Sequence, residues 1–282
     1  MKRHVQEKRY YQDAFISNED VILKQLVHEG FNINRLSEDV LMRFDQIDHV
    51  GQIKNTRMLE DMVGLKPDMR VLDVGGGLGG AARYLTHKYG CMVNVIDLIP
   101  DRCRGGLRLT RLTGLVDRVT YQAADAQRIP FRDGTFNLIW SQDAFDGIED
   151  KTLLLAECRR VLKPHGELVF TDHLRGPREA VPDGVYLWPD DTSRFTFEDY
   201  RALLKKQGFK VMEEIDLTEW ALNSLRRVTQ SITGAQRLKI QKAQGVHYYQ
   251  KLVAFIDSFR DYLKIGAVHY GAFKAACKKL QG

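Results

Sequence analysis

A short apolar run that ends in an acid and then breaks into glycines constrains this chain more than any other feature. Residues 71–80 read Val-Leu-Asp-Val-Gly-Gly-Gly-Leu-Gly-Gly. The apolar half predicts a buried strand, and the glycines predict a tight turn where little side chain separates the backbone from a ligand. A helix is expected to begin at Gly80. The spacing Gly75-x-Gly77-x-x-Gly80 fits the glycine fingerprint of strand–turn–helix units that bind nucleotides.

Asp73 narrows the choice of ligand, because it stands two residues before the first glycine. A carboxylate there would repel a diphosphate lying on the turn by several kcal/mol in a partly dry cleft, on the order of what Coulomb's law gives at contact distance. A cationic cofactor without phosphate would be attracted instead. S-adenosyl-L-methionine, with its sulfonium and ammonium groups, is such a cofactor. Asp73 therefore predicts S-adenosylmethionine binding and disfavours a nicotinamide-dependent oxidoreductase.

Composition excludes several other classes. The chain has 282 residues, 44% hydrophobic and 28% charged, which is ordinary for a globular protein. Its 42 basic residues are spread among 37 acids, which disfavours nucleic-acid binding. We expect no stable membrane insertion, because no stretch approaches the roughly 20 apolar residues that span a bilayer. The charged start argues against a signal peptide, and the four cysteines form no Cys-x-x-Cys pair, so we expect a cytoplasmic protein, as a monomer or homodimer.

Strand and helix patterns alternate from residue 69 onward, which predicts an α/β fold with a doubly wound, mostly parallel seven-stranded sheet and an antiparallel last strand. The expected strands are 70–74, 92–97, 119–123, 136–140, 167–173, 209–217 and 268–275, with a turn at 163–166 before the fifth. We divide the chain into an N-terminal helical cap (1–65), a cofactor-binding core (66–178) and a lid with the last two strands (179–282). The lid is the helical pattern inserted between those two strands.

Three stretches carry a resemblance to a known family: residues 71–85, 139–145 and 160–164. They resemble the Rossmann-like, S-adenosylmethionine-dependent methyltransferases, in particular those that methylate sarcosine and dimethylglycine, with the phosphoethanolamine methyltransferases more distant. The segment 49–51 also looks like that group. The resemblance implies methyl transfer to an amine nitrogen of a small-molecule acceptor. Two alternatives stay open: carbon or oxygen methylation of a natural product, quinone or lipid, which a large apolar lid pocket would favour, and a binding protein without chemistry.

Site roles follow partly from position and partly from the resemblance. Asp97 ends the second strand about 20 residues after the glycine turn, where a carboxylate binds ribose hydroxyls, although it also suits a helix cap. By resemblance, Asp125 would accept the adenine amino group, with a turn cap as the alternative, and Asp143 would orient or attract the acceptor amine. The expected cofactor-binding residues are Asp73, Gly75, Gly76, Gly77, Gly79, Asp97, Leu98, Asp125, Ala126 and Ser141.

One departure from the family concerns the general base. The relatives commonly have a histidine two residues after the Asp-Ala-Phe run, and this chain has Gly147 there. His173 and His49 are the substitutes that would take a proton near neutral pH, and each is equally well explained as a structural histidine. No metal-ligand cluster stands out, so metal independence is expected.

Two further expectations concern the acceptor. Aromatic rings would stabilise a methylated ammonium by about 0.5 to 2 kcal/mol each, although any of them also suits the core. The candidates are Trp140, Trp188, Tyr10 and Tyr11. The loop residues Pro189-Asp190-Asp191 disfavour a phosphorylated acceptor, because two acids would repel it.

Overall fold

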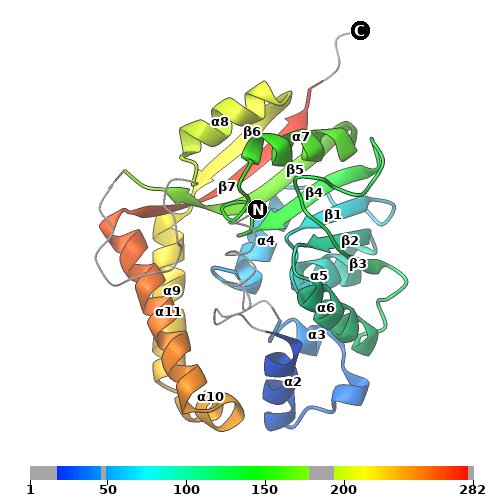
Figure 1. Cartoon of the computed structure of the whole chain (residues 1–282). Helices are drawn as coiled ribbons and strands as arrows, with labels where there is room; N and C mark the ends of the chain where they lie inside the picture. Colours follow the sequence, from blue (N-terminus) through cyan, green and yellow to red (C-terminus); the bar gives the residue numbers. More distant parts are fainter. Residues whose placement is uncertain (1–17, 46–48, 178–193, 279–282) are drawn as a thin grey trace.

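A computed structural model describes residues 18–45, 49–177 and 194–278 of the chain. Seven strands form one sheet in the order β3-β2-β1-β4-β5-β7-β6 (Figure 1). Their bounds are β1 Arg70–Val74, β2 Met92–Asp97, β3 Val119–Ala123, β4 Phe136–Gln142, β5 Leu162–Arg175, β6 Phe209–Asp216 and β7 Val268–Cys277. Strands β1 to β5 pair in parallel, and β7 is antiparallel to both of its neighbours. The predicted sheet class is confirmed.

Helices cover both faces of this sheet, which is why its central strands are apolar on both sides. Two neighbouring residues of β1 belong to different hydrophobic clusters. Val71 packs in the cluster that includes α4 and α5, whereas Leu72 packs in the cluster that includes α7 and α8. The helices are α2 Glu19–His28, η1 Ile33–Arg35, α3 Glu38–Leu41, α4 Ile53–Asp61, α5 Gly80–Tyr89, α6 Pro100–Leu112, α7 Lys151–Val161, α8 Phe197–Lys206, α9 Thr218–Thr233, α10 Arg237–Gln244 and α11 Val246–Ile265. None of these described helices has the length and apolar character that crossing a membrane requires.

The prediction of a turn at 163–166 is wrong, because these residues belong to β5. The pairing register shifts here: Phe136 pairs with Leu162, whereas Leu138 pairs with Glu167. His165, within this irregular stretch, takes a positive φ of 64°. A bulge of this kind inserts extra residues without ending the strand, so it is hard to tell from a turn in the sequence.

The inserted helices form an arm beside the sheet. Helices α9 and α11 run side by side away from β6 and β7, and α10 joins them at the far tip, opposite α2 (Figure 1). The side-chain amide of Gln244 donates to the carbonyl of Val21 at 2.8 Å, so the tip of the arm contacts the N-terminal helices. This contact bounds the outer end of the space between the arm and the sheet.

A buried arginine ties the N-terminal helices to the glycine turn. Arg83 on α5 is 0% exposed, and its guanidinium lies 2.6 Å from the carboxylate of Asp45 and donates to the carbonyl of Leu78 at 2.6 Å. Burial alone would lower its pKa, but Tyr121 and the Asp45 carboxylate hold it above the usual value. The cap and the turn are thereby held in one arrangement.

Candidate active site

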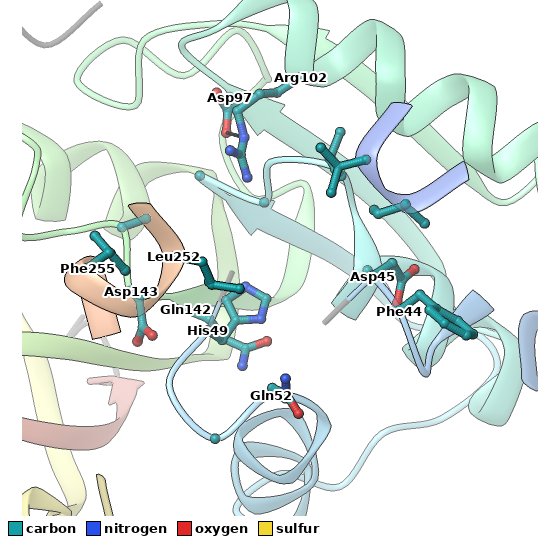
Figure 2. A pocket seen from close by; sticks show the side chains of 18 of the residues that line it. Phe44, Asp45, His49, Gln52, Asp97, Arg102, Gln142, Asp143, Leu252 and Phe255 are labelled. Carbon is teal, nitrogen blue, oxygen red and sulfur yellow. Dashed lines mark ion pairs between the residues drawn. The ribbon is translucent and has the colours of Figure 1, made fainter. Parts of the chain in front are cut away.

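A cavity of about 730 Å³ lies where the carboxyl ends of the central strands meet the arm and α2 (Figure 2). Ligands of open α/β sheets bind in this crevice. Asp97 and Arg102 lie at one end of the cavity, and Asp143 and His49 lie at another. The cavity is lined by, among others, Gly75, Gly76, Asp97, Leu98, Asp125, Ala126, His49, Asp143 and His173. Most of the predicted site residues therefore share one space.

The glycine turn forms part of the cavity wall and needs its glycines for different reasons. Gly75 has a φ of +70°, and a Cβ there would collide with the side chain of Ala144. A Cβ at Gly76 would collide with the carboxylate of Asp73 directly behind it. The turn is held by the N–H groups of Gly75 and Gly76, which both donate to the carbonyl of Ile96 at 2.8 and 3.2 Å.

Asp73 is a buried acid with one carboxylate oxygen that has no hydrogen-bond partner among the described residues. This oxygen is Oδ2, and the residue is 2% exposed. Burial, with a further contribution from the Asp97 charge, raises its pKa to about 7. A buried carboxylate of this kind is stabilised by a cation placed beside it. The orphaned oxygen behind Gly76 fits the cationic cofactor that the sequence predicts.

Asp97 and Asp125 face the cavity but are also engaged locally. The Asp97 carboxylate accepts from the N–H of Gly77 at 3.0 Å and from that of Ile99 at 2.8 Å. Asp125 accepts from the N–H of Gln127 at 2.8 Å, as in a capped turn. Each carboxylate has further lone pairs, so the turn-capping alternative and the cofactor-binding role are compatible.

Four of the predicted cofactor residues, with Asp73 among them, are not part of the cavity lining. Gly77 and Gly79 are buried within the turn, and they shape it rather than face the cavity. Ser141 is 0% exposed, and its hydroxyl donates to the carbonyl of Val74 at 2.8 Å. Its side chain joins β4 to β1, and the contact between Ser141 and the cofactor stays a prediction.

Asp143 is held firmly at the end of β4. Its φ is 53°, a left-handed conformation that costs energy for any residue with a side chain and is least costly for Asp and Asn. Oδ2 accepts from the N–H of Val50 at 3.0 Å, and Oδ1 accepts from the hydroxyls of Thr171 at 2.8 Å and Tyr270 at 2.5 Å. Strain at a cavity wall, maintained by three donors, is typical of a functional position.

His173 pairs with an acid that the sequence did not single out as functional. Its Nδ1 lies 3.1 Å from Oδ2 of Asp146, and both residues are buried. Burial alone would lower the pKa of His173, but the Asp146 charge and hydrogen bond raise it to about 9. The Asp146 carboxylate therefore favours the protonated form of His173, and the role of His173 as a base stays a prediction. His49 is the other predicted base that lines the cavity.

Replacing Asp146 with asparagine is expected to lower the pKa of His173 from about 9, because the largest contribution that raises it is lost while burial still lowers it; the Asp143 and Asp172 charges remain. The raised pKa of His173 also makes the stability of the fold depend on pH. A raised histidine pKa stabilises the fold fully below the unfolded pKa, and this contribution is lost as the pH rises through about 9.

Imidazole NMR titration checks this, with His173→Gln identifying the resonance. A wild-type His173 that titrates near 6.5 would contradict the pairing.

His173 also belongs to a group of three residues that could bind a metal ion. Asp146, Asp172 and His173 each bring one ligand atom within 4.8 Å of the others. These atoms are already engaged, since Asp172 accepts from the N–H of Asp146 at 2.9 Å and from the hydroxyl of Tyr200 at 2.5 Å. A protonated imidazole has no lone pair for a metal. The cluster is therefore an ion-pair network that orients His173, and metal independence stays a prediction.

The aromatic candidates for an ammonium cage divide into two groups. Trp140 is 0% exposed, and its indole N–H donates to Oε1 of Gln142 at 3.0 Å, so it belongs to the core. Tyr10, Tyr11 and Trp188 lie outside the described residues, as do Pro189, Asp190 and Asp191. The sequence predicts Tyr270 only as part of the last strand, whereas its hydroxyl donates to Asp143.

Comparison with known proteins agrees with this geometry. Residues 72–170 match a family model described as a methyltransferase domain. The chain is 33% identical over 177 residues to a sarcosine/dimethylglycine N-methyltransferase of Halorhodospira halochloris, covering 56% of this chain and 63% of that protein. It is 31% identical over 178 residues to phosphoethanolamine N-methyltransferase 3 of Arabidopsis thaliana, covering 63% and 36%. The chain thus spans less than two thirds of either relative.

Among solved structures, phosphoethanolamine N-methyltransferase 2 of Haemonchus contortus, in complex with S-adenosyl-L-methionine, aligns with a TM-score of 0.78 at 21% identity. The alignment covers 97% of this chain and 60% of that one. The chain shares the fold of that structure, and residues 72–170 resemble a methyltransferase domain. Its sequence is similar to the sarcosine/dimethylglycine and phosphoethanolamine N-methyltransferases, as predicted.

Proposed function

We propose that this protein transfers the methyl group of S-adenosylmethionine to an amine nitrogen of a small molecule. The observation that carries the proposal is Asp143: a strained carboxylate, held by three donors, in the same cavity as the glycine turn. A carboxylate fixed in this way attracts an ammonium group and orients its nitrogen. The similarity to N-methyltransferases of sarcosine, dimethylglycine and phosphoethanolamine supports the choice of nitrogen.

The residues that would hold the cofactor surround the turn. From behind Gly76, Asp73 would stabilise the cationic end of the cofactor through its charge. Asp97 and Asp125, which line the cavity, would accept from the ribose and from the adenine. When bound, the cofactor supplies an electrophilic methyl group. The protein then contributes mainly by holding the acceptor nitrogen in line, which can be worth about 7 to 11 kcal/mol. His49 is the imidazole that we propose for accepting the amine proton, because the protonated form of His173 is favoured.

A second candidate is favoured by the arm. Its cavity-facing residues include Val228, Ile232, Leu252 and Phe255, which suit an apolar acceptor such as a natural product, quinone or lipid methylated on carbon or oxygen. The same core serves these chemistries. The nature of the product separates the two candidates.

The test is transfer of labelled methyl from S-adenosylmethionine to glycine, sarcosine, dimethylglycine, phosphoethanolamine and simple N-methyl alkylamines. Labelled amine, identified by mass and fragmentation, is the expected result. Cofactor that binds while no amine becomes labelled would overturn the proposal and favour carbon or oxygen acceptors.

A further inference from the structure

The wall that α11 contributes to the cavity is apolar and begins beside the candidate reactive residues. Phe259 packs edge-on against His173, with ring centroids 4.9 Å apart. His173 in turn lies 5.5 Å from the ring of Tyr270, whose hydroxyl donates to Asp143. The inner end of α11 is therefore adjacent to the carboxylate that we assign to the amine.

From this point an apolar stripe leads away along one face of the helix. Ile256 and Phe255, then Leu252, then Tyr248 follow Phe259 at spacings of three or four residues, and these four residues line the cavity. Residues at this spacing share one face of a helix. At 1.5 Å per residue, the stripe from Phe259 to Tyr248 is about 16 Å long. Such a wall is much longer than an amine of two or three carbons can cover.

The stripe retains accessible apolar surface. Phe255 is 38% exposed and Leu252 is half-buried, and both face the cavity (Figure 2). Half-buried Val228 on α9 and Ile240 on α10 extend the same lining. Partly exposed apolar side chains gathered on a concave wall mark a site for an apolar ligand.

Charge sets the direction in which such a ligand would lie. Residues 220–256, which span most of the arm, contain six Lys or Arg residues and no Asp or Glu. None of the described arm residues that line the cavity is an acid, whereas Asp143 at the inner end offers a carboxylate to an ammonium group. A molecule with one amine and an apolar body would place the amine inward and the body outward along α11.

We propose, building on amine methylation as the proposed function, that the acceptor is an amphiphilic amine. Its nitrogen lies at Asp143, and an extended apolar body lies along the stripe formed by Tyr248, Leu252, Phe255 and Ile256. Sarcosine and dimethylglycine fill only the inner end of this site. The arm thus selects acceptors by the length of their apolar part.

The experiment compares N-methyl alkylamines with butyl, hexyl and octyl chains against sarcosine, each below its micelle concentration. Burying a methylene contributes about 0.8 kcal/mol, so kcat/KM is expected to rise roughly fourfold per added methylene until the wall is covered. Phe255→Ala and Leu252→Ala are expected to flatten this dependence on chain length. Leu238→Ala is the matched control, because Leu238 on α10 is 67% exposed and is not part of the stripe.

A binding measurement distinguishes failure of this inference from failure of the proposed function. Calorimetry with octyl amine in the presence of S-adenosylhomocysteine measures the apolar site without turnover. Amines that are methylated with no preference for longer chains would overturn this inference and leave the proposed function standing. Long amines that bind through Phe255 and Leu252 but are not methylated would support the apolar site and overturn amine methylation. If kcat/KM of Phe255→Ala or Leu252→Ala rises with chain length as steeply as in the wild type, the inference is also overturned.

Discussion

Replacing Asp73 with asparagine is expected to weaken S-adenosylmethionine binding by about 2 to 5 kcal/mol, at least roughly 30-fold, because removing one partner of a buried charge pair costs that much. The wild-type protein should show a matching pH dependence. Its Asp73 has a pKa of about 7 before the cofactor binds, so binding below that pH requires loss of a proton. The affinity should therefore rise nearly tenfold per pH unit between pH 5 and 6 and level off above 7, and Asp73→Asn should abolish this slope.

The same substitution should stabilise the cofactor-free protein at high pH. An acid whose pKa is raised on folding favours the fold fully only below its unfolded pKa, and this contribution falls as the pH rises through about 7. The ionised carboxylate destabilises the fold above that pH by up to about 4 kcal/mol, because each tenfold change in an acid's ionisation constant corresponds to about 1.4 kcal/mol.

Calorimetric binding and thermal unfolding at pH 5 and 8 check both effects, with exposed Asp117→Asn as the matched control. An Asp73→Asn protein that binds the cofactor normally would refute the role of Asp73.

Replacing Asp143 with asparagine is expected to lower kcat/KM for the amine about 10- to 100-fold. A hydrogen bond to a charged group contributes about 1.5 to 3 kcal/mol, and the amide lacks that charge. Asparagine tolerates the left-handed conformation at φ 53°, so the fold should be retained. Cofactor affinity should not change, because Asp143 lies away from Asp97 in the cavity.

Two companion variants separate charge from strain. Asp143→Ala should add a loss of stability, because alanine is costly in the left-handed region by about 1 to 2 kcal/mol. Tyr270→Phe removes one of the three donors to Asp143 and should give a smaller loss of kcat/KM. Steady-state kinetics with thermal unfolding measures all three. An Asp143→Asn enzyme within twofold of wild type would contradict the assignment of the amine to this carboxylate.

The strands that line the cofactor end of the cavity were predictable because their signals are local. The predicted bounds of the first three strands match β1, β2 and β3. The first two are short runs rich in apolar residues, and the third begins with the strand-favouring residues Val119, Thr120 and Tyr121. Asp97 and Asp125 follow such strands, and parallel strands bring their carboxyl ends to one edge, so chain position alone placed them near the cavity. The bulge in β5 escaped prediction because its geometry depends on pairing with β4.

The amino-acid sequence by itself determined the fold class, the glycine turn and the identity of the carboxylates at the strand ends, because these depend on backbone conformation and on the alternation of elements. The tertiary structure decided what each polar side chain can do. Among the described residues, it left one buried oxygen of Asp73 without a hydrogen-bond partner, paired His173 with Asp146 and turned Ser141 toward β1. It also aligned α11 with the cavity. Hydrogen bonds, pKa shifts and ligand shape arise between residues far apart in the chain, and only folding brings those residues together.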